Sequence, residues 1–286
     1  MDLKDFTNTP NKLPGIPKVA QEVIASFSHA DVTIEQIATL IEADPVLSAK
    51  MLWLANSAYF HVSRSVGTVA QAIQILGFAM VRNLVLGSCV VGAFRQTPGM
   101  DLPVFWRYNL YTACAARWLA MRIGSSGDAA FTLGLMHAIG QLQMHAIAPA
   151  ALASLDQQLN VLDTKRADLE TSSLGFHYGD VSAALAKFWN FPDVFVDALG
   201  RVTSPLAAPD FYAPAACVHL GAWRARHEVL GSSDAEVLVT YPEAVSNRLG
   251  LDAGWVQLPG RAPSGSGESL MPPFSELTSG LEQLFA

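Results

Sequence analysis

In the run Thr33-Ile34-Glu35-Gln36-Ile37-Ala38-Thr39-Leu40-Ile41-Glu42-Ala43-Asp44-Pro45, two helix starts follow one another. A threonine followed three residues later by a glutamine has the form of a capping box, in which two side chains satisfy the free N–H groups of a helix end. Asp44 and Pro45 have the form of an N-cap and the first residue of the next helix. The run therefore predicts two consecutive helices. Its expected buried stripe consists of Ile34, Ile37, Ala38 and Ile41.

The same signals continue on both sides of this run. Apolar residues recur at helical spacing over residues 16–27, and Thr68 to Gln71 repeats the capping-box pattern ahead of Gly77, a residue suited to ending a helix. A hydrophobic helix is expected from about Met80 to Phe94. The residues expected to face inward after Asp44 are Val46, Leu47, Leu52, Leu54 and Ala55.

The second half of the chain also has helical patterns. Helices are expected over about 104–121, 149–159, 180–189, 192–199 and 214–227, and Asp128 is expected to cap the helix that carries His137. The best strand candidate, Val237 to Tyr241, is solitary and would have no pairing partner, so coil or helix is expected there. The predicted fold class is therefore all-α.

Turn-forming residues divide the chain. Gln96 to Pro103 has the composition of a linker, which separates an N-terminal helical lobe (10–97) from a second lobe (98–230). A variable C-terminal region (231–286) follows, with a segment rich in Pro, Gly and Ser over 259–273. Its end is expected to form an amphipathic helix over 274–285 that either docks on the body or binds a partner. One side of that helix would carry Phe274, Leu277, Leu281 and Leu284.

Composition excludes several classes of protein. The 286 residues are 51% hydrophobic and 15% charged, which is ample for a large core, and the net charge of −7 provides no basic field for nucleic acid. The longest apolar stretch, over 81–94, is too short to span a bilayer and is interrupted by Arg82 and Asn83. Three separated cysteines form no C-x-x-C motif, and the N-terminus is no signal peptide. We expect a cytoplasmic protein that binds neither nucleic acid nor membrane.

Several pieces of the chain, taken together and in order, are specific. They are Leu13–Pro17 (LPGIP), Ile41–Leu47 (IEADPVL), Leu54–Phe60 (LANSAYF), Val69–Gly77 (VAQAIQILG), Phe105–Tyr108 (FWRY), Leu135–Gly140 (LMHAIG), Gly175–Val181 (GFHYGDV) and Leu185–Pro192 (LAKFWNFP). This pattern resembles the HDOD family, the HD-related output domains of bacterial signalling proteins, over about residues 10–225. The resemblance implies a two-lobed helical fold whose second lobe is HD-like, and a role in signal transduction.

The resemblance also implies a metal site, and the chain departs from it. In the HD phosphohydrolase superfamily the matching signature is L-H-D-I-G-K, with a His-Asp pair that binds metal. Here His137 is kept, but the aspartate position is Ala138 and the lysine position is Gln141. The position of an earlier histidine is Tyr108. A later aspartate would fall within 217–222, where no acid occurs, and of the additional histidines in two-metal relatives one matches His177, while a pair falls near 202–203.

Metal chemistry supports the same interpretation. A hydrolytic metal centre needs about three protein ligands and an open position for water, so two imidazoles without a carboxylate would hold an ion weakly. We therefore expect no catalytic residues, no cofactor and no metal site; any ion held would lie on His137 and His177. The expected ligand-binding remnant of the site is a pocket of Tyr108, His137, Gln141 and His177. The simplest alternative for His137 is a hydrogen-bonded core histidine.

The sequence thus predicts a non-catalytic bacterial signal-transduction output domain that acts by contact with a signalling protein, with a small ligand left open. The alternative is a metal-dependent phosphohydrolase acting on a nucleotide or phosphoester. No G-x-G-x-x-G, Walker A, G-x-S-x-G or H-E-x-x-H motif points to another enzyme class. The partner's identity and the oligomeric state stay open.

Overall fold

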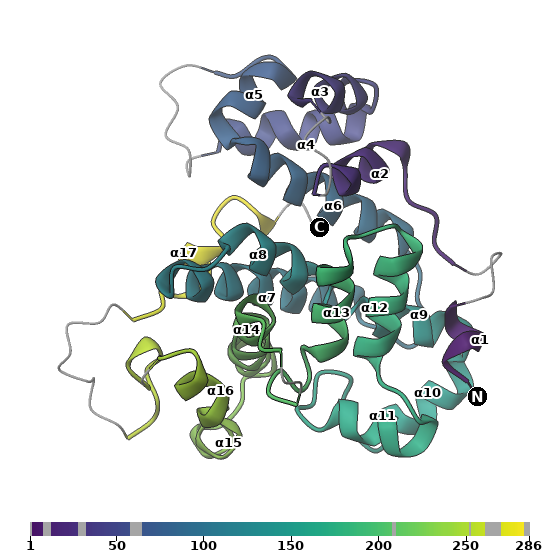
Figure 1. Cartoon of the computed structure of the whole chain (residues 1–286), viewed down its shortest axis with the longest axis vertical. Coiled ribbons are helices and arrows are strands. Elements are labelled where there is room, and N and C mark those ends of the chain that lie inside the picture. The colour runs from purple at the N-terminus through teal and green to yellow at the C-terminus, as the bar shows by residue number, and fades with distance from the viewer. Residues whose placement is uncertain are drawn as a thin grey trace.

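Helices build the described part of the chain, and no strand occurs in it (Figure 1). The computed structural model describes residues 2–7, 13–27, 33–57, 65–207, 210–251, 253–260 and 270–282. The first helices are α1 (Leu3–Thr7), α2 (Lys18–Ala25), α3 (Ile34–Glu42), α4 (Pro45–Ala55), α5 (Val69–Leu76) and α6 (Phe78–Ala93). The second lobe contains α7 (Leu102–Arg122), α8 (Gly127–Met136), α9 (Ile139–Ile147), α10 (Pro149–Asp156), α11 (Arg166–Leu174), α12 (Tyr178–Phe188), α13 (Asp193–Arg201) and α14 (Ala213–Leu230). The last elements are α15 (Asp234–Thr240), α16 (Glu243–Arg248), a short 3-10 turn (Ala253–Trp255) and α17 (Phe274–Leu277). The all-α prediction is confirmed.

The predicted caps are present at the starts of α3, α4 and α5. Thr33 and Gln36 form a reciprocal capping box, and the Asp44 carboxylate accepts from the N–H of Val46 at 2.9 Å and of Leu47 at 3.1 Å. Thr68 accepts from Gln71 N–H at 3.2 Å. Each bond satisfies a donor that the helix itself leaves free. The cap predicted at Asp128 is wrong, because Ser126 accepts the first-turn N–H of α8 instead.

Two predicted inward residues face solvent. Ile37 and Ile41 are buried in α3, but Ile34, in its first turn, is 46% exposed. In α4, Leu47 and Leu54 are buried while Val46 is 64% exposed. Consecutive helical residues point about 100° apart, so Val46 points away from the core that Leu47 faces. Ile34 lies on the same side of α3 as Ile41 but is exposed at the first residue of the helix.

Gly77 separates α5 from α6. Its φ of +76° lies in the region that side-chain-bearing residues rarely adopt, and the two helix axes differ by 113° across it. No single helix in the described ranges has the length and hydropathy to cross a bilayer; α5 and α6 meet that test only as this sharply bent pair.

The two lobes share one hydrophobic core. In the first lobe α3, α4 and α5 pack together, and α2 packs on α6, which also contacts α8 of the second lobe. Figure 1 shows this first lobe above the second. Helix α1 belongs spatially to the second lobe, where it packs on α9 and α12, and the Phe6 ring lies 5.2 Å from that of Phe176. The Trp189 indole N–H donates to the carbonyl of Pro14 at 2.9 Å.

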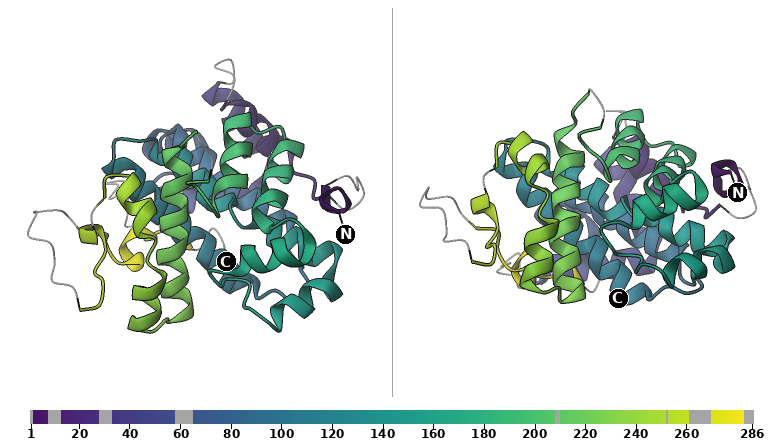
Figure 2. Two further views of the ribbon diagram at one scale, coloured as in Figure 1. Left: turned by 60° about the horizontal axis from the view of Figure 1, so that its bottom comes forward. Right: turned by 90° about the horizontal axis from the view of Figure 1, so that it is seen from below.

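The centre of the second lobe is a tight bundle of α7, α8 and α14, with α9, α12 and α13 beside it. Gly140 marks the closest approach between α9 and α12, because a Cβ there would lie 2.0 Å from the Tyr178 carbonyl oxygen. Figure 2 shows α14 flanked by the α15–α16 pair. The segment considered as a lone strand is helical through Thr240, which accepts from the Trp223 indole N–H at 3.1 Å.

The C-terminal tail docks on the body. Phe274 is 3% exposed, and its ring stacks on Tyr111 of α7 at 4.3 Å with an interplanar angle of 5°. Leu281 is also buried, while Leu284 lies outside the described residues. The predicted helix over 274–285 is wrong in length, because α17 ends at Leu277 and Gly280 adopts a φ of +80° that an α-helix cannot contain.

Candidate functional site

The HD-like signature lies at a helix break. Helix α8 ends at Met136 and α9 begins at Ile139, so His137 and Ala138 form the junction. The Ser182 hydroxyl of α12 holds this junction from outside. It donates to the His137 carbonyl at 3.1 Å and accepts from Gly140 N–H at 2.8 Å. The break therefore turns the His137 side chain into the lobe and fixes it there.

His137 is a fully buried histidine with both ring nitrogens in use. Its Nδ1 lies 2.7 Å from the carbonyl oxygen of Gly134, which only accepts, so Nδ1 carries the hydrogen. Its Nε2 lies 3.0 Å from the Tyr108 hydroxyl and must accept from it. Burial lowers the pKa of His137 to about 3, a shift to which the charge of Arg226 adds. The side chain is thus a neutral, satisfied core imidazole.

Arg226 of α14 completes this arrangement, and no sequence pattern singled it out. Its Nη2 donates to the Tyr108 hydroxyl at 3.3 Å, and its Nε donates to the Leu162 carbonyl. Burial raises the pKa of Tyr108, and the guanidinium opposes that shift. A directed chain of hydrogen bonds therefore runs from Arg226 through Tyr108 and His137 to Gly134.

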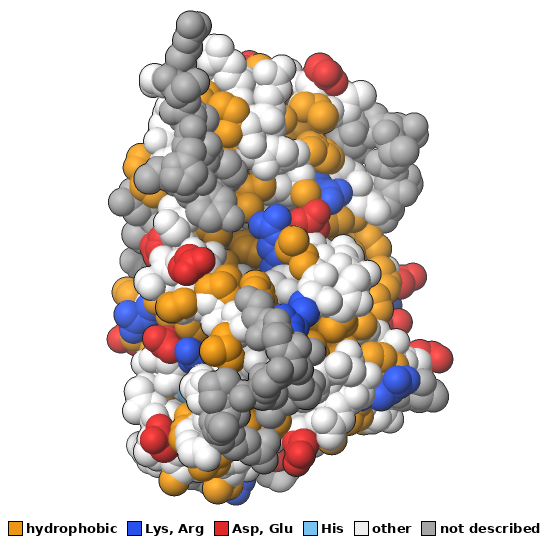
Figure 3. Space-filling model, turned by 90° about the vertical axis from the view of Figure 1, so that its left-hand side faces the viewer, with side chains coloured by type: hydrophobic (Ala, Val, Ile, Leu, Met, Phe, Trp, Pro, Cys, Tyr) orange, Lys and Arg blue, Asp and Glu red, His pale blue; other side chains and the backbone are white. Residues whose placement is uncertain are grey.

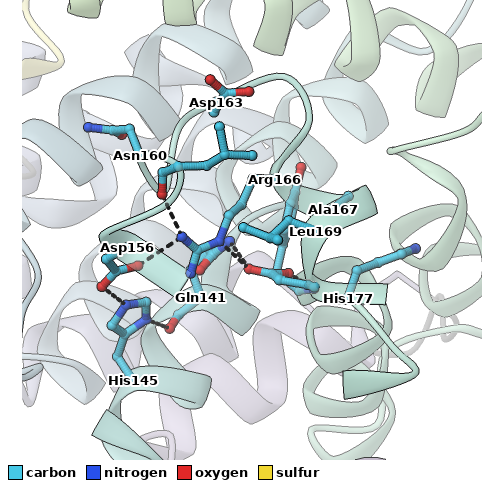
Figure 4. Close-up of polar contacts among 12 residues, drawn as sticks. Gln141, His145, Asp156, Asn160, Asp163, Arg166, Ala167, Leu169 and His177 are labelled. Carbon is cyan, nitrogen blue, oxygen red and sulfur yellow. Dashed lines mark hydrogen bonds and ion pairs between the residues drawn. The ribbon is translucent and has the colours of Figure 1, made fainter. Parts of the chain in front are cut away.

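Gln141 belongs to a different polar cluster (Figure 4). Its side-chain amide donates to Oε1 of Glu170 at 2.7 Å, and the same oxygen accepts from Arg166 Nε at 2.8 Å. The second Glu170 oxygen accepts from Tyr178 N–H at 2.7 Å. Arg166 and Glu170 are both fully buried. Gln141 is therefore occupied in joining α9 to α11.

The cluster extends to α10 through Asp156. That carboxylate lies 2.8 Å from Arg166 Nη1 and 3.0 Å from His145 Nε2, and His145 Nδ1 lies 2.7 Å from the carbonyl of Gln141. These side chains bond to one another, so the cluster joins α9, α10, α11 and α12. Neither carboxylate of the cluster is bonded to His137. The sequence reasoning missed it because α11 was not predicted, and an Arg and a Glu four residues apart usually mark a solvated helix face.

His177 acts as the N-cap of α12. Its Nδ1 accepts from Gly179 N–H at 3.1 Å and Asp180 N–H at 3.4 Å, and Asp180 accepts from His177 N–H at 2.9 Å. With Nδ1 accepting, the hydrogen is on Nε2, which lies 3.2 Å from the Thr203 hydroxyl oxygen. No hydrogen bond or ring contact joins His177 to His137 in the described part of the chain.

These residues do not fit the metal ion that an HD-like fold implies. Ala138 offers a methyl group, the ring nitrogens of His137 are committed, and Nδ1 of His177 caps a helix. Within the described ranges, no three or more His, Cys, Asp or Glu side chains are grouped so as to hold an ion. A guanidinium bonded to Tyr108 places positive charge near His137, which further disfavours a cation there.

A pocket of about 690 Å³ opens beside Arg226, bounded by residues of α11, α12 and α14 and the segment after α13. His177, Thr203, His219 and Arg226 are among its lining residues. Of the four residues predicted to form a ligand pocket, His177 alone lines this one. Tyr108 and His137 are buried among the helices, and Gln141 lies in the Glu170 cluster. The predicted residues thus fall into three separate environments.

Comparisons with known proteins agree with this architecture. The family model described as "HDOD domain" matches residues 13–205. A solved structure named "Putative phosphohydrolase", from Shewanella amazonensis SB2B, is 26% identical with a TM-score of 0.72, and the match covers 98% of this chain and 96% of that one. An HDOD domain protein with unknown function from Geobacter sulfurreducens is 21% identical with a TM-score of 0.64, over 86% of this chain and 94% of that one, which shows a shared fold.

Two further relatives are longer than this chain. A "Putative signal transduction protein" from Marinobacter aquaeolei VT8 is 24% identical with a TM-score of 0.65, over 88% of this chain and 56% of that one. An uncharacterized protein of Treponema pallidum (strain Nichols) is 25% identical over 204 residues, which are 71% of this chain. The match spans 40% of that curated relative's length.

Proposed function

The chain belongs to the HDOD domain family, and on that basis we propose that it is a non-catalytic signal-transduction domain that regulates by contact with a partner protein. The observation that carries the proposal is the hydrogen-bond chain from Arg226 through Tyr108 to His137. These hydrogen bonds occupy Nε2 of His137 and place the Arg226 guanidinium next to Tyr108. A metal-dependent hydrolase needs open imidazole nitrogens and carboxylates at that place.

Surface chemistry supports a protein partner. On the face in Figure 3, Lys and Arg side chains lie singly among apolar and acidic ones and form no dense basic area. That distribution, with the net charge of −7, favours a protein over a nucleic acid. The proposal includes a cytoplasmic location, which the three buried free cysteines support.

The contact face we favour is the outer side of α4. Val46 is 64% exposed and Trp53 is 39% exposed, and residues seven apart lie on the same side of a helix. Exposed aromatic residues of this kind are common anchors at protein interfaces. The tail is a poorer choice in its docked state, because Phe274 and Leu281 are buried against the body.

The test of catalysis compares wild type with His137→Ala on phosphodiester and nucleotide substrates, with Mg²⁺ or Mn²⁺ added. We expect no turnover by either protein. Turnover by wild type that His137→Ala abolishes would overturn the non-catalytic proposal and favour the metal-dependent phosphohydrolase.

The test of contact measures capture of a partner from native cells by wild type and by Trp53→Ala. We expect a specific partner to be retained by wild type and lost by Trp53→Ala. Val239→Ser is the matched control, because Val239 is 86% exposed on α15, away from α4. Equal retention by all three proteins would contradict the α4 contact face.

A further inference from the structure

We infer that the 690 Å³ pocket beside Arg226 binds a small organic anion, whose phosphate or carboxylate group pairs with the Arg226 guanidinium. This goes beyond the proposed function, since a ligand site of this kind exists whether or not a partner protein is bound. A volume of 690 Å³ lies within the range of small-molecule sites, about 300–1,000 Å³.

The charge of Arg226 is not balanced by an ion pair among the described residues. This half-buried side chain donates to the Leu162 carbonyl and to the Tyr108 hydroxyl, and neither acceptor is charged. In the parts of the chain that the structure describes, no carboxylate lies within ion-pair distance of it. The carboxylate of the lining, Asp168, is exposed. A guanidinium presented to a recess in this way favours an anion, which it can bind through two parallel hydrogen bonds.

The charge of Arg226 also acts on two histidines of the same helix, α14. Besides burial, the Arg226 charge lowers the pKa of His219, and it adds to burial in lowering the pKa of His227 to about 4. Both histidines are therefore held neutral at pH 7. Of these two histidines His219 lines the pocket, and Arg226 is the Lys or Arg side chain among the lining residues, so a single anionic group on a ligand is its complement.

Two other lining residues, Thr203 and His219, add hydrogen-bonding capacity to the pocket. Because the ring hydrogen of His177 is on Nε2 and points at the Thr203 oxygen, the Thr203 hydroxyl hydrogen is left to donate. His219 donates from Nδ1 to the Val202 carbonyl at 2.8 Å, so its Nε2 carries a lone pair. The pocket thus offers a donor and an acceptor beside the cation. The complementary ligand carries a hydroxyl or N–H donor in addition to its anionic group, as sugar phosphates and hydroxy acids do.

The experiment titrates the full chain with inorganic phosphate, ribose 5-phosphate, uncharged ribose and malate at constant ionic strength, by calorimetry and by the shift in Tm. We expect millimolar or tighter binding of ribose 5-phosphate or malate, and none of ribose. The preferred anion identifies the source, since inorganic phosphate lacks the carbon-bound hydroxyl groups of ribose 5-phosphate and malate. Phosphorus NMR of the ribose 5-phosphate sample shows whether the compound is only bound or is also hydrolysed. An unchanged compound supports a binding site. Hydrolysis would contradict the proposal that the protein is non-catalytic, but not the inference of an anion site.

Three variants locate the site. Arg226→Gln should weaken anion binding about tenfold or more. Arg226→Lys should restore part of the binding, because lysine keeps the positive charge but lacks the paired N–H donors of a guanidinium. Arg107→Gln is the control, an equal loss of charge at an exposed residue outside the lining. Thr203→Val, which leaves Arg226 in place, should give a smaller loss and keeps the site testable if Arg226→Gln does not fold. Failure of wild type to bind any of the three anions, or equal binding by wild type and folded Arg226→Gln, would overturn the inference.

Discussion

The Tyr108 hydroxyl donates to Nε2 of His137 at 3.0 Å, so two positions that match metal ligands in HD phosphohydrolases are bonded to each other. The two residues come from α7 and from the junction after α8. A tyrosine side chain is longer than a histidine side chain and ends in a hydrogen-bond donor. Its hydroxyl therefore bonds to the imidazole nitrogen that would otherwise be free to bind a metal ion. In this chain the two side chains are part of the core.

Tyr108→Phe should destabilise the protein by about 1–3 kcal/mol, because it leaves the buried Nε2 of His137 without a donor. Urea unfolding followed by circular dichroism measures the loss. Tyr212→Phe is the control, since the Tyr212 hydroxyl makes no hydrogen bond within the described residues, and it should change stability little. Equal effects of the two substitutions would contradict the assigned hydrogen bond.

Glu170→Gln should destabilise by about 1–3 kcal/mol, because it replaces one charged partner of the buried Arg166 guanidinium by a neutral amide while Asp156 keeps the other ion pair. The matched control is Glu228→Gln, which breaks the exposed Arg224–Glu228 pair of the same i,i+4 spacing and should cost about 0–1 kcal/mol. Thermal unfolding of both variants makes the comparison. A loss at Glu170 no larger than at Glu228 would show that the cluster is not a structural brace.

Stability should fall as pH drops below about 6.5. Burial lowers the pKa of His137 from 6.5 to about 3, so above pH 6.5 the imidazole is neutral in both folded and unfolded chains. Below that value the unfolded chain takes up a proton that the folded chain does not, and the stability contribution is lost progressively toward pH 3. His219 and His227, whose pKa values are also lowered by burial, act in the same direction. The dependence of Tm on pH should be shallower in His137→Phe; an unchanged slope would contradict this account.

Gly140→Ala should be strongly destabilising, because the added methyl would lie 2.0 Å from the Tyr178 carbonyl oxygen and 2.8 Å from the Ser182 nitrogen. Both atoms belong to the backbone of α12 and cannot move aside alone. Gly92→Ala in α6, where nothing lies within 4 Å, should be neutral or stabilising by up to about 1 kcal/mol. The unfolding midpoint should therefore fall in Gly140→Ala and stay unchanged or rise in Gly92→Ala; a tolerated Gly140→Ala would show that α9 and α12 are farther apart.

Local signals predicted much of the fold and little of the site. Thr33, Asp44 and Thr68 sit before helices and cap them, because a cap depends on residues two or three positions away. The role of Arg226 could not be predicted, since its partner Tyr108 lies 118 residues earlier and only tertiary packing brings them together. The burial of the Arg166–Glu170 pair could not be predicted for another reason. Its i,i+4 spacing is the same as that of ion pairs on exposed helix faces.

The position of α1 on the second lobe has a consequence for synthesis. The side-chain amide of Gln143 donates to the carbonyl of Phe6 at 3.3 Å across 137 residues of sequence. Chains are made at about 5–20 residues per second, so the first helix leaves the ribosome on the order of 10–30 s before α9 exists to receive it. During that interval the Phe6 ring, which is fully buried in the folded protein, lacks the helices that later cover it. Packing of α1 against α9 and α12 therefore joins one helix to others that are made much later.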